Sequence, residues 1–416
     1  MQSCRNRTEK RRGAVVPLAA LLMTLLVGML AFSIDIGYIC SVEAELQNAA
    51  DSAALAGAQQ LQNAFVQFYA PGQTQRQQIY NTATTDTSNP NSPIPTAQRF
   101  AAANQAGGVY VQVPASDITF SYYDGTNAPV PASYPTQFPN TVTVTTRRDN
   151  TANGPLGLFF AQIFGISSTN LTATASATIY AGDVSSLRVI PGVDAHILPV
   201  ALDVNVWTNY AKGNLSSPWL EDSISTGPKG NPQLQVYPFG TNTPGSFGLV
   251  DTGVPSNTAP AFRNWINDGA TPNDISYLLS NNLLPVSMNQ PQPWKVGPGL
   301  QSTLVSNFQA EMGKPNLIPL FQPVEPPPSN PPPIDPGPNY VAATGSGQDA
   351  TYAIVGFVGV TITQATGNGN NLNISIQPSA IVDPTAVLSN ISPARVSQPS
   401  QFGTSQTTFV SAKLTQ

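Results

Sequence analysis

The chain has 416 residues, a formal net charge of −5 and only 9% charged residues, whereas globular proteins contain about a quarter. The first 12 residues hold five of the 17 basic and one of the 22 acidic residues, so the rest carries a net charge of −9. Nucleic-acid binding needs basic patches, and this balance argues against nucleic acid as a partner. Forty prolines and 32 glycines predict many turns and short strands after the N-terminal segment.

The N-terminal segment predicts a membrane-spanning helix. Residues 13–34 contain no charged residue, and these 22 residues would be about 33 Å long as a helix, against about 30 Å for the bilayer core. Acidic residues follow from Asp35 onward, and no basic residue comes before Arg76. The basic residues that precede the span are Arg5, Arg7, Lys10, Arg11 and Arg12. This asymmetry predicts a cytoplasmic N-terminus and an exported C-terminal portion.

The helix is predicted to continue beyond the membrane to residue 61. Its apolar side chains recur at alternating steps of three and four residues, which places them on one helical face. The side chains of this face are large at its start and are alanines at its end: Ile39, Val42, Leu46, Ala49, Ala53 and Ala56. Small side chains allow a close backbone approach, so we predict that this face packs against the protein's own sheet or against a partner helix.

Three features of this segment resemble the TadE/TadG-like family, the Tad (Flp) pilus-assembly proteins of bacteria. They are RRGAV before the span, the Asp35-Ile36-Gly37 step after it, and LQNAADSAALAGAQ at residues 46–59. The resemblance implies a cell-envelope protein of the bacterial inner membrane that assembles or decorates an adhesive pilus. Its partners would be other pilus-assembly proteins or pilins, or a second copy associating through the N-terminal helix.

The segment lacks one residue of a processed pilin. Pilins cut by a prepilin peptidase are cleaved after a glycine and carry Glu five positions beyond it, but the fifth position after Gly13 is Leu18. We therefore expect an uncut, pseudopilin-like accessory protein. The alternative is a cleaved secretory signal, because Ala31-Phe32-Ser33 has the small-x-small form of a cleavage site. The length of the apolar run and the uninterrupted helical pattern favour the anchor.

The predicted fold class is α+β, with a long N-terminal transmembrane and amphipathic helix before a β-rich ectodomain of antiparallel sheets and a few short helices. The domains follow from changes in pattern and composition. They are a cytoplasmic basic segment (1–12), the transmembrane helix (13–36), its amphipathic extension (37–61), an α+β pilin-like ectodomain (62–186), a second β-rich domain (187–322), a Pro-rich linker (323–338), a hairpin returning to the second domain (339–394) and a loose C-terminal tail (395–416).

Periodicity and turn residues predict the individual elements. In the first ectodomain they are helices at 96–105 and 155–164 and strands at 109–113, 117–123, 140–148 and 171–180. In the second region they are strands at 196–206 and 316–321, helices at 262–265, 274–284 and 300–312, and a turn at 294–300. The hairpin is formed by residues 352–363 and 371–377. Its first strand is apolar on both faces, so we expect it at the centre of the second region's sheet.

The residues that carry chemistry are few, and they predict neither a cofactor nor a metal. The chain has one histidine, and its two cysteines, Cys4 and Cys40, are predicted on opposite sides of the membrane, which makes a zinc site improbable. The alternative function is a secreted or surface hydrolase, since Asp251-Thr252-Gly253 resembles the catalytic loop of aspartic proteases. Such enzymes pair two carboxylates, so one loop would require a dimer. The tripeptide is also an ordinary turn, and we expect a structural protein rather than an enzyme.

Overall fold

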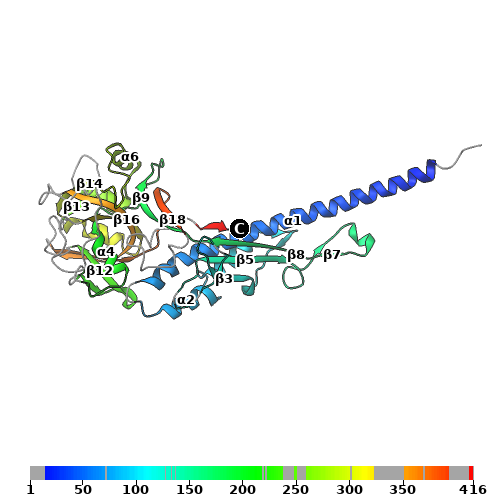
Figure 1. Cartoon of the computed structure of the whole chain (residues 1–416), viewed down its shortest axis with the longest axis horizontal. Coiled ribbons are helices and arrows are strands. Elements are labelled where there is room, and N and C mark those ends of the chain that lie inside the picture. The colour runs from blue at the N-terminus through cyan, green and yellow to red at the C-terminus, as the bar shows by residue number, and fades with distance from the viewer. Residues whose placement is uncertain are drawn as a thin grey trace, which may run out of the picture. The chain divides into compact units, whose positions relative to one another are not determined.

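The computed structural model describes residues 15–70, 73–126, 128–132, 134–135, 137–217, 220, 223–237, 248–250, 259–299, 302–322, 351–368, 371–392 and 412–415. An N-terminal apolar helix precedes a β-rich region with antiparallel sheets and short helices, which confirms the predicted fold class (Figure 1). The chain divides into two compact units. The first takes residues up to Ala53 together with Ala97–Ile118 and Val144–Ala175, and the second takes the remainder.

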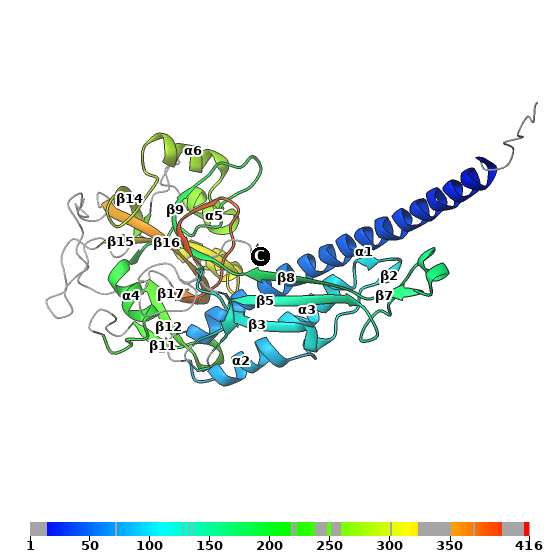
Figure 2. The same cartoon turned by 45° about the vertical axis from the view of Figure 1, so that its right-hand side comes forward.

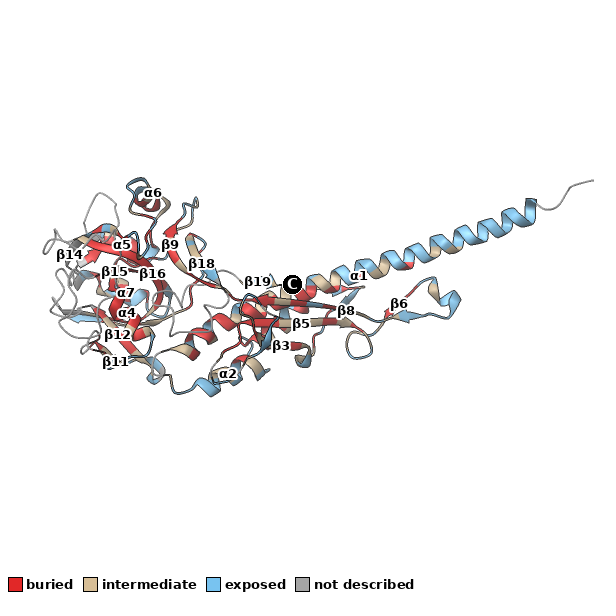
Figure 3. Cartoon of the chain, in the orientation of Figure 1, coloured by how far each residue is buried: buried red, intermediate tan, exposed pale blue. Residues whose placement is uncertain are grey.

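Helix α1 (Val15–Tyr69) is continuous over 55 residues. Its first half is exposed, whereas its second half has a buried side, as the change from pale blue to red in Figure 3 shows. The predicted end at residue 61 is wrong, because the helix continues for eight more residues. Leu61, Phe65 and Phe68 are fully buried and follow the buried Ala54 and Ala58 in steps of three and four residues, so the buried side of the helix continues to its end.

Short helices and strands follow α1. They are α2 (Arg76–Thr85), α3 (Pro93–Ala101), β1 (Gln105–Ala106), β2 (Val109–Tyr110), η1 (Ala115–Asp117), β3 (Ile118–Tyr122), β4 (Val130–Pro131), β5 (Thr141–Arg148), β6 (Leu156–Gly157), η2 (Ala161–Phe164), β7 (Ser168–Thr169) and β8 (Leu171–Thr178). Strands β1 and β2 form one antiparallel pair and β6 and β7 another. The helix predicted at 155–164 is wrong, since a short strand and a single 3-10 turn occupy this segment.

A five-stranded sheet has the order β19-β8-β5-β3-β4, where β19 (Lys413–Thr415) comes from the end of the chain. The prediction of a loose tail over 395–416 is therefore wrong for its last described residues. Leu414 lies opposite Ala177 in an antiparallel pair, and β19 occupies the outer edge of β8. An unpaired strand edge leaves backbone N–H and C=O groups without partners, and β19 pairs with β8 at residues 176–178.

The second unit contains a ten-stranded sheet whose main path is β10-β15-β16-β17-β12-β11. Figure 2 labels the strands β15, β16, β17, β12 and β11 of this path. Its strands are β9 (Ala181–Leu187), β10 (Leu202–Asp203), β11 (Ile224–Thr226), β12 (Pro232–Tyr237), β13 (Gly248–Val250), β14 (Gln292–Gly299), β15 (Pro315–Gln322), β16 (Thr351–Asn368), β17 (Asn371–Pro378) and β18 (Ala386–Ser392). Since β9 pairs with β16 and β18, the predicted boundary between residues 186 and 187 is wrong, because it cuts a strand of this sheet.

Strand β16 is at the centre of this sheet, as its apolar pattern predicts. It pairs antiparallel with β15, β17 and β14, and the hairpin with β17 is present. Val358 and Val360 belong to one buried apolar cluster, whereas Ile354 and Phe357 belong to another. A strand that is covered on both faces needs apolar residues in both sets of positions, which explains its unbroken apolar run.

Other elements of the second unit differ from expectation. The predicted strand at 196–206 gives way to helix α4 (Val204–Ala211), because the Asp203 carboxylate accepts a hydrogen bond from the Asn205 N–H and caps the helix. Residues 294–300 were predicted as a turn and lie mostly in strand β14. The predicted helices are present as α5 (Ala259–Asp268), α6 (Pro272–Ser280) and α7 (Val305–Ala310). Thr271 caps α6 in a capping box with Asp274.

Candidate functional site

The carboxylate of Asp35 binds a loop that is more than 120 residues away in the sequence. Its Oδ1 accepts a hydrogen bond from the Phe159 N–H at 2.8 Å, and its Oδ2 accepts from Phe160 at 3.0 Å and Ala161 at 2.6 Å. Asp35 is only 3% exposed, and the Tyr38 ring lies 5.2 Å from the ring of Phe159. The first N–H groups of a helical turn lack partners within the turn, so Asp35 caps η2 from another element. We call these three hydrogen bonds the Asp35 clasp.

The loop that the clasp holds is the segment between β6 and β7, which we call the tip (residues 158–167). Its ends are joined by a hydrogen bond from the Leu158 N–H to the Ser167 carbonyl at 3.0 Å. Inside it, the Ile166 N–H donates to the Ala161 carbonyl at 3.1 Å, and Gly165 ends η2 in the left-handed conformation with φ 81°. The tip is therefore a compact loop whose backbone bonds largely to itself and to Asp35.

Arg148 is a buried cation, 6% exposed, at the end of β5. It donates hydrogen bonds to four carbonyls: Nη1 to Ala106 at 2.6 Å and Gly107 at 3.4 Å, Nε to Gly154 at 2.9 Å, and Nη2 to Pro155 at 3.4 Å. Within the described residues no carboxylate oxygen lies within 4.0 Å of it. Arg148 thus ties the β1–β2 turn to the start of β6 through neutral acceptors.

Helix α1 contacts this arrangement at two further points. The Glu45 carboxylate accepts a hydrogen bond from the Gly107 N–H at 2.7 Å, and the Thr146 hydroxyl donates to the Leu46 carbonyl at 2.9 Å. Gly107 has φ +58°, and a Cβ there would lie 2.9 Å from Nη1 of Arg148, so the position requires glycine. The second half of the helix thereby holds a strand and a turn of the first unit directly.

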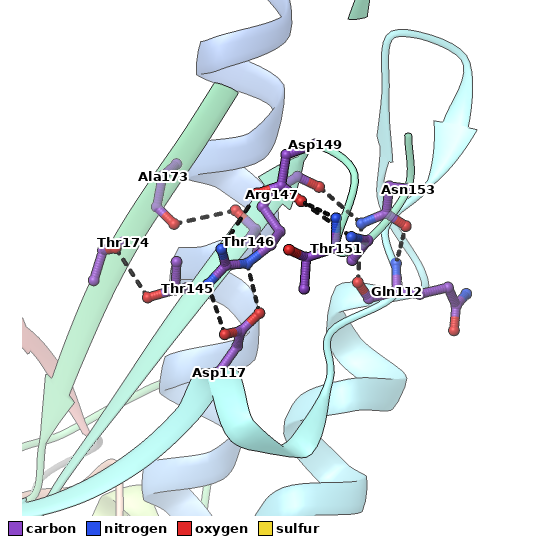
Figure 4. A network of polar contacts seen from close by, with 11 residues as sticks. Gln112, Asp117, Thr145, Thr146, Arg147, Asp149, Thr151, Asn153, Ala173 and Thr174 are labelled. Atoms are coloured by element: carbon purple, nitrogen blue, oxygen red, sulfur yellow. Dashed lines mark hydrogen bonds and ion pairs between the residues drawn. The ribbon is translucent and has the colours of Figure 1, made fainter. Parts of the chain in front are cut away.

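Arg147, the preceding residue of β5, forms a separate network (Figure 4). Its Nε and Nη2 donate to the two carboxylate oxygens of Asp117, both at 2.7 Å, and its Nη1 donates to Asp149 at 3.3 Å. The hydrogen bonds to Asp117 raise the pKa of Arg147 above its ordinary value. The Asn153 amide donates to the carbonyls of Arg147 and Gln112, which closes the turn after β5.

Two segments of the chain match known families. Residues 13–60 match Tad, described as Flp pilus-assembly TadE/G-like, and residues 77–177 match Tad_C, described as Tad-like Flp pilus-assembly. The N-terminal segment and the domain that follows it are thus of the Tad, Flp pilus-assembly type. No curated protein and no solved structure matches it. The resemblance inferred from the N-terminal motifs is thus confirmed, and both partners of the Asp35 clasp lie in segments that match Tad families.

The predicted packing face lies mostly on the buried side of α1. Val42, Leu46, Ala49 and Ala53 are buried, whereas Ile39 and Ala56 are partly exposed. Buried small residues also lie beside this face, so it is wider than predicted: Ala50, Ala54, Gly57 and Ala58. Its role in packing against a sheet or a partner stays a prediction. The five residues predicted to set the topology, Arg5, Arg7, Lys10, Arg11 and Arg12, lie outside the described residues.

The loop on which the alternative function as a hydrolase depends is not among the described residues. Asp251-Thr252-Gly253 lies outside them. His196 is exposed, its backbone N–H donates to the Asp383 carboxylate, and its carbonyl accepts a hydrogen bond from the Leu317 N–H. Across the described ranges, no three His, Cys, Asp or Glu side chains form a group that could hold a metal ion. In the first unit, the side chains of Asp35, Glu45 and Arg148 form hydrogen bonds with backbone groups of other segments.

Sequence reasoning missed the roles of Asp35, Glu45 and Arg148. Two signals were present: an acidic residue directly after an apolar span, within the Asp35-Ile36-Gly37 step of the Tad resemblance, and a pair of arginines ending an alternating strand. In a strand, neighbouring side chains point to opposite faces, so one arginine of such a pair faces inward. The partners of that inward arginine are backbone carbonyls, and no sequence pattern marks them.

Replacing Asp35 with asparagine is expected to loosen the tip. Asparagine has a single acceptor oxygen, so it leaves one or two of the three N–H groups opposite an NH₂ group, at a cost of about 1–3 kcal/mol. Amide hydrogen exchange of a peptide covering 158–167, measured on the full-length protein in micelles, should become faster. Glu43→Gln, which removes an equal charge from an exposed position on the same helix, should leave that exchange unchanged. Equal exchange in Asp35→Asn and wild type would contradict the clasp.

Replacing Ala53 with leucine is expected to overpack the buried side of α1. Ala53 is fully buried, and added methylenes in a packed site cost about 1–3 kcal/mol of unfolding free energy. Ala44→Leu makes the same change at an exposed position of the same helix and should be near neutral. Thermal unfolding followed by circular dichroism should show a lower melting temperature for Ala53→Leu than for Ala44→Leu and wild type. A loss of pilin co-purification with unchanged stability would instead assign the face to a partner helix.

Proposed function

We propose that this Tad-family chain is a single-pass protein of the bacterial inner membrane that acts structurally in Flp pilus assembly. Its N-terminus would be cytoplasmic and its ectodomain exported, and it would work by anchoring and helix–helix association rather than by catalysis. The observation that carries the proposal is the exposed apolar half of α1. Thirteen large apolar residues between Val15 and Ile34 are exposed, and α1 is the one described helix long and apolar enough to cross a membrane.

The apolar side chains in the exposed half of α1 must be shielded from water. Leaving one large apolar side chain in water costs about 1.5–3 kcal/mol, so thirteen of them cost on the order of tens of kcal/mol. This exceeds the roughly 5–15 kcal/mol that stabilises a typical folded domain. A bilayer satisfies the requirement, because the charge-free length of residues 13–34 is about the thickness of the hydrocarbon core.

The direction of insertion follows from charge. Five basic residues precede the span within the first 12 positions, and Asp35, Glu43 and Glu45 follow it. Basic residues are retained on the cytoplasmic side, so the ectodomain is exported.

The two halves of α1 support a pseudopilin-like component. The first half is available to the membrane and to partner helices, while the second half holds a turn of the same chain through Glu45 and a strand through Leu46. Leu18, where a processed pilin has Glu, favours an anchor that keeps its N-terminus. Other pilus-assembly proteins, pilins or a second copy of the chain would then associate along the span.

Protease added to spheroplasts tests the proposal. It should remove the ectodomain and leave a small membrane-embedded fragment that carries an N-terminal tag, because the tag is cytoplasmic. Protease should reach the tag itself only after the membrane is lysed. A full-length protected protein would contradict the orientation. A mature chain starting at Ile34, read by mass spectrometry, would mean that the segment is a cleaved secretory signal.

A further inference from the structure

The tip exposes large apolar side chains beside the apolar half of α1. Phe159 is 63%, Ile163 79%, Phe164 75% and Ile166 55% exposed. The tip belongs to an uncharged stretch, since no Asp, Glu, Lys, Arg or His occurs from residue 150 to 182. Contiguous exposed apolar side chains on a loop mark a surface that something apolar covers.

The position of the tip along α1 identifies what covers it. Phe164 lines one apolar groove together with Leu25, Gly28 and Phe32 of the helix. Gly28 lies seven residues before Asp35, about 10 Å along the helix axis, and is well inside the charge-free span. Whatever surrounds α1 at Gly28 therefore surrounds Phe164 as well.

The backbone of the tip suits an environment without water. Non-helical backbone at membrane depth requires that its polar groups bond within the protein. The Asp35 carboxylate accepts hydrogen bonds from three N–H groups of the tip, and the Ile163 N–H donates to the Phe160 carbonyl at 3.1 Å. The one long polar side chain, Gln162, donates to the Leu158 carbonyl at 2.6 Å and so bonds inside the tip.

We propose that the tip inserts into the lipid bilayer beside α1 and forms a second membrane contact of this chain. The proposal rests on the membrane anchoring proposed above. Asp35 lies at the end of the span and fixes the tip to the helix, so the two apolar elements enter the same leaflet together. A single helix can rotate and tilt in a bilayer, and its neighbours and interfacial anchors set its orientation. The tip thereby fixes which face of the span remains open to partner helices.

A fluorescent label at three positions tests this. The full-length protein with Cys4→Ser and Cys40→Ser, carrying Ile163→Cys, Leu25→Cys or Asn48→Cys, is labelled with an environment-sensitive dye and reconstituted into phosphatidylcholine vesicles. Ile163 and Asn48 are both exposed, so neither substitution disturbs packing. Asn48 lies 13 residues beyond Asp35 on the same helix, about 20 Å farther out. Quenching by doxyl-labelled lipid reports acyl-chain contact, and quenching by iodide reports water.

The label at Ile163 should lose emission with doxyl lipid to an extent comparable with the Leu25 label, and iodide should quench only the Asn48 label. With Leu25 quenched by lipid, quenching at Ile163 by iodide would overturn the insertion and leave the anchor intact. Protection of Ile163 from both quenchers would overturn it too, and would mean that protein covers the tip. A Leu25 label quenched by iodide would refute the anchor, and the insertion with it.

Discussion

Arg148→Met is expected to lower the free energy of unfolding of the first unit by about 2–5 kcal/mol. Methionine keeps most of the apolar stem, but the carbonyls of Ala106 and Gly154, bound at 2.6 and 2.9 Å, lose a charged donor in a buried place. Each buried acceptor left without its partner costs about 1–3 kcal/mol. Hydrogen exchange on the full-length protein in micelles should rise in peptides that cover β1–β2 and the start of β6.

Arg147→Met is the matched control, since it makes the same change at the adjacent residue of the same strand. The Arg147 side chain is 23% exposed in its ion pair with Asp117, and such pairs contribute at most about 1 kcal/mol. A similar loss in both variants would contradict the account, because the burial of Arg148 would then have no energetic consequence.

Asp203→Asn is expected to stabilise the second unit at pH 8 by up to about 4 kcal/mol. Burial raises the pKa of Asp203 from its ordinary value of 3.8 to about 7, against the opposing hydrogen bonds from the N–H groups of Asn205 and Val206. Since each pH unit between these values corresponds to about 1.4 kcal/mol, ionisation in the folded state costs about 4 kcal/mol. Asparagine caps helices as well as aspartate does and carries no charge to bury.

The pH dependence follows from the sign of this shift. The folded state binds the proton more tightly than the unfolded state, so wild-type stability is highest below about pH 4 and falls as pH rises toward about 7. The two proteins should therefore be equally stable at pH 4 and diverge above it. Denaturant unfolding followed by tryptophan fluorescence measures this, because the buried Trp207 lies in the helix that Asp203 caps.

Asp268→Asn changes an exposed residue of α5 and should leave the difference in stability between pH 4 and pH 8 unaltered. If Asp203→Asn were less stable than wild type at pH 8, the carboxylate would be ionised and favourable at the N-terminus of α4.

Patterns that depend on neighbouring residues were readable from the sequence. The 3,4 spacing predicts α1, the apolar run predicts β16 as a central strand, and the pattern at 274–284 predicts the helix α6. In each case the preference and the structure come from the same few residues, so no distant partner is needed to decide between alternatives.

Elements that depend on distant partners were not readable. Leu156, Phe159, Phe160 and Ile163 have helical spacing, yet their segment folds as a strand and a 3-10 turn because Asp35, on another element, takes the N–H groups. The end of α1 was missed for a different reason. Gln and Asn residues between Leu61 and Phe68 hid a spacing that continues the buried side of the helix.

The central claim is that the apolar half of α1 crosses the membrane with the N-terminus inside, and the two cysteines test it directly. Cys4 precedes the span, and Cys40, which is exposed, follows it. A membrane-impermeant maleimide is added to intact spheroplasts that express either Cys4→Ser, which leaves Cys40, or Cys40→Ser, which leaves Cys4. The account predicts labelling of Cys40 in intact spheroplasts and of Cys4 only after lysis. Labelling of Cys4 in intact spheroplasts, with Cys40 protected until lysis, would contradict it.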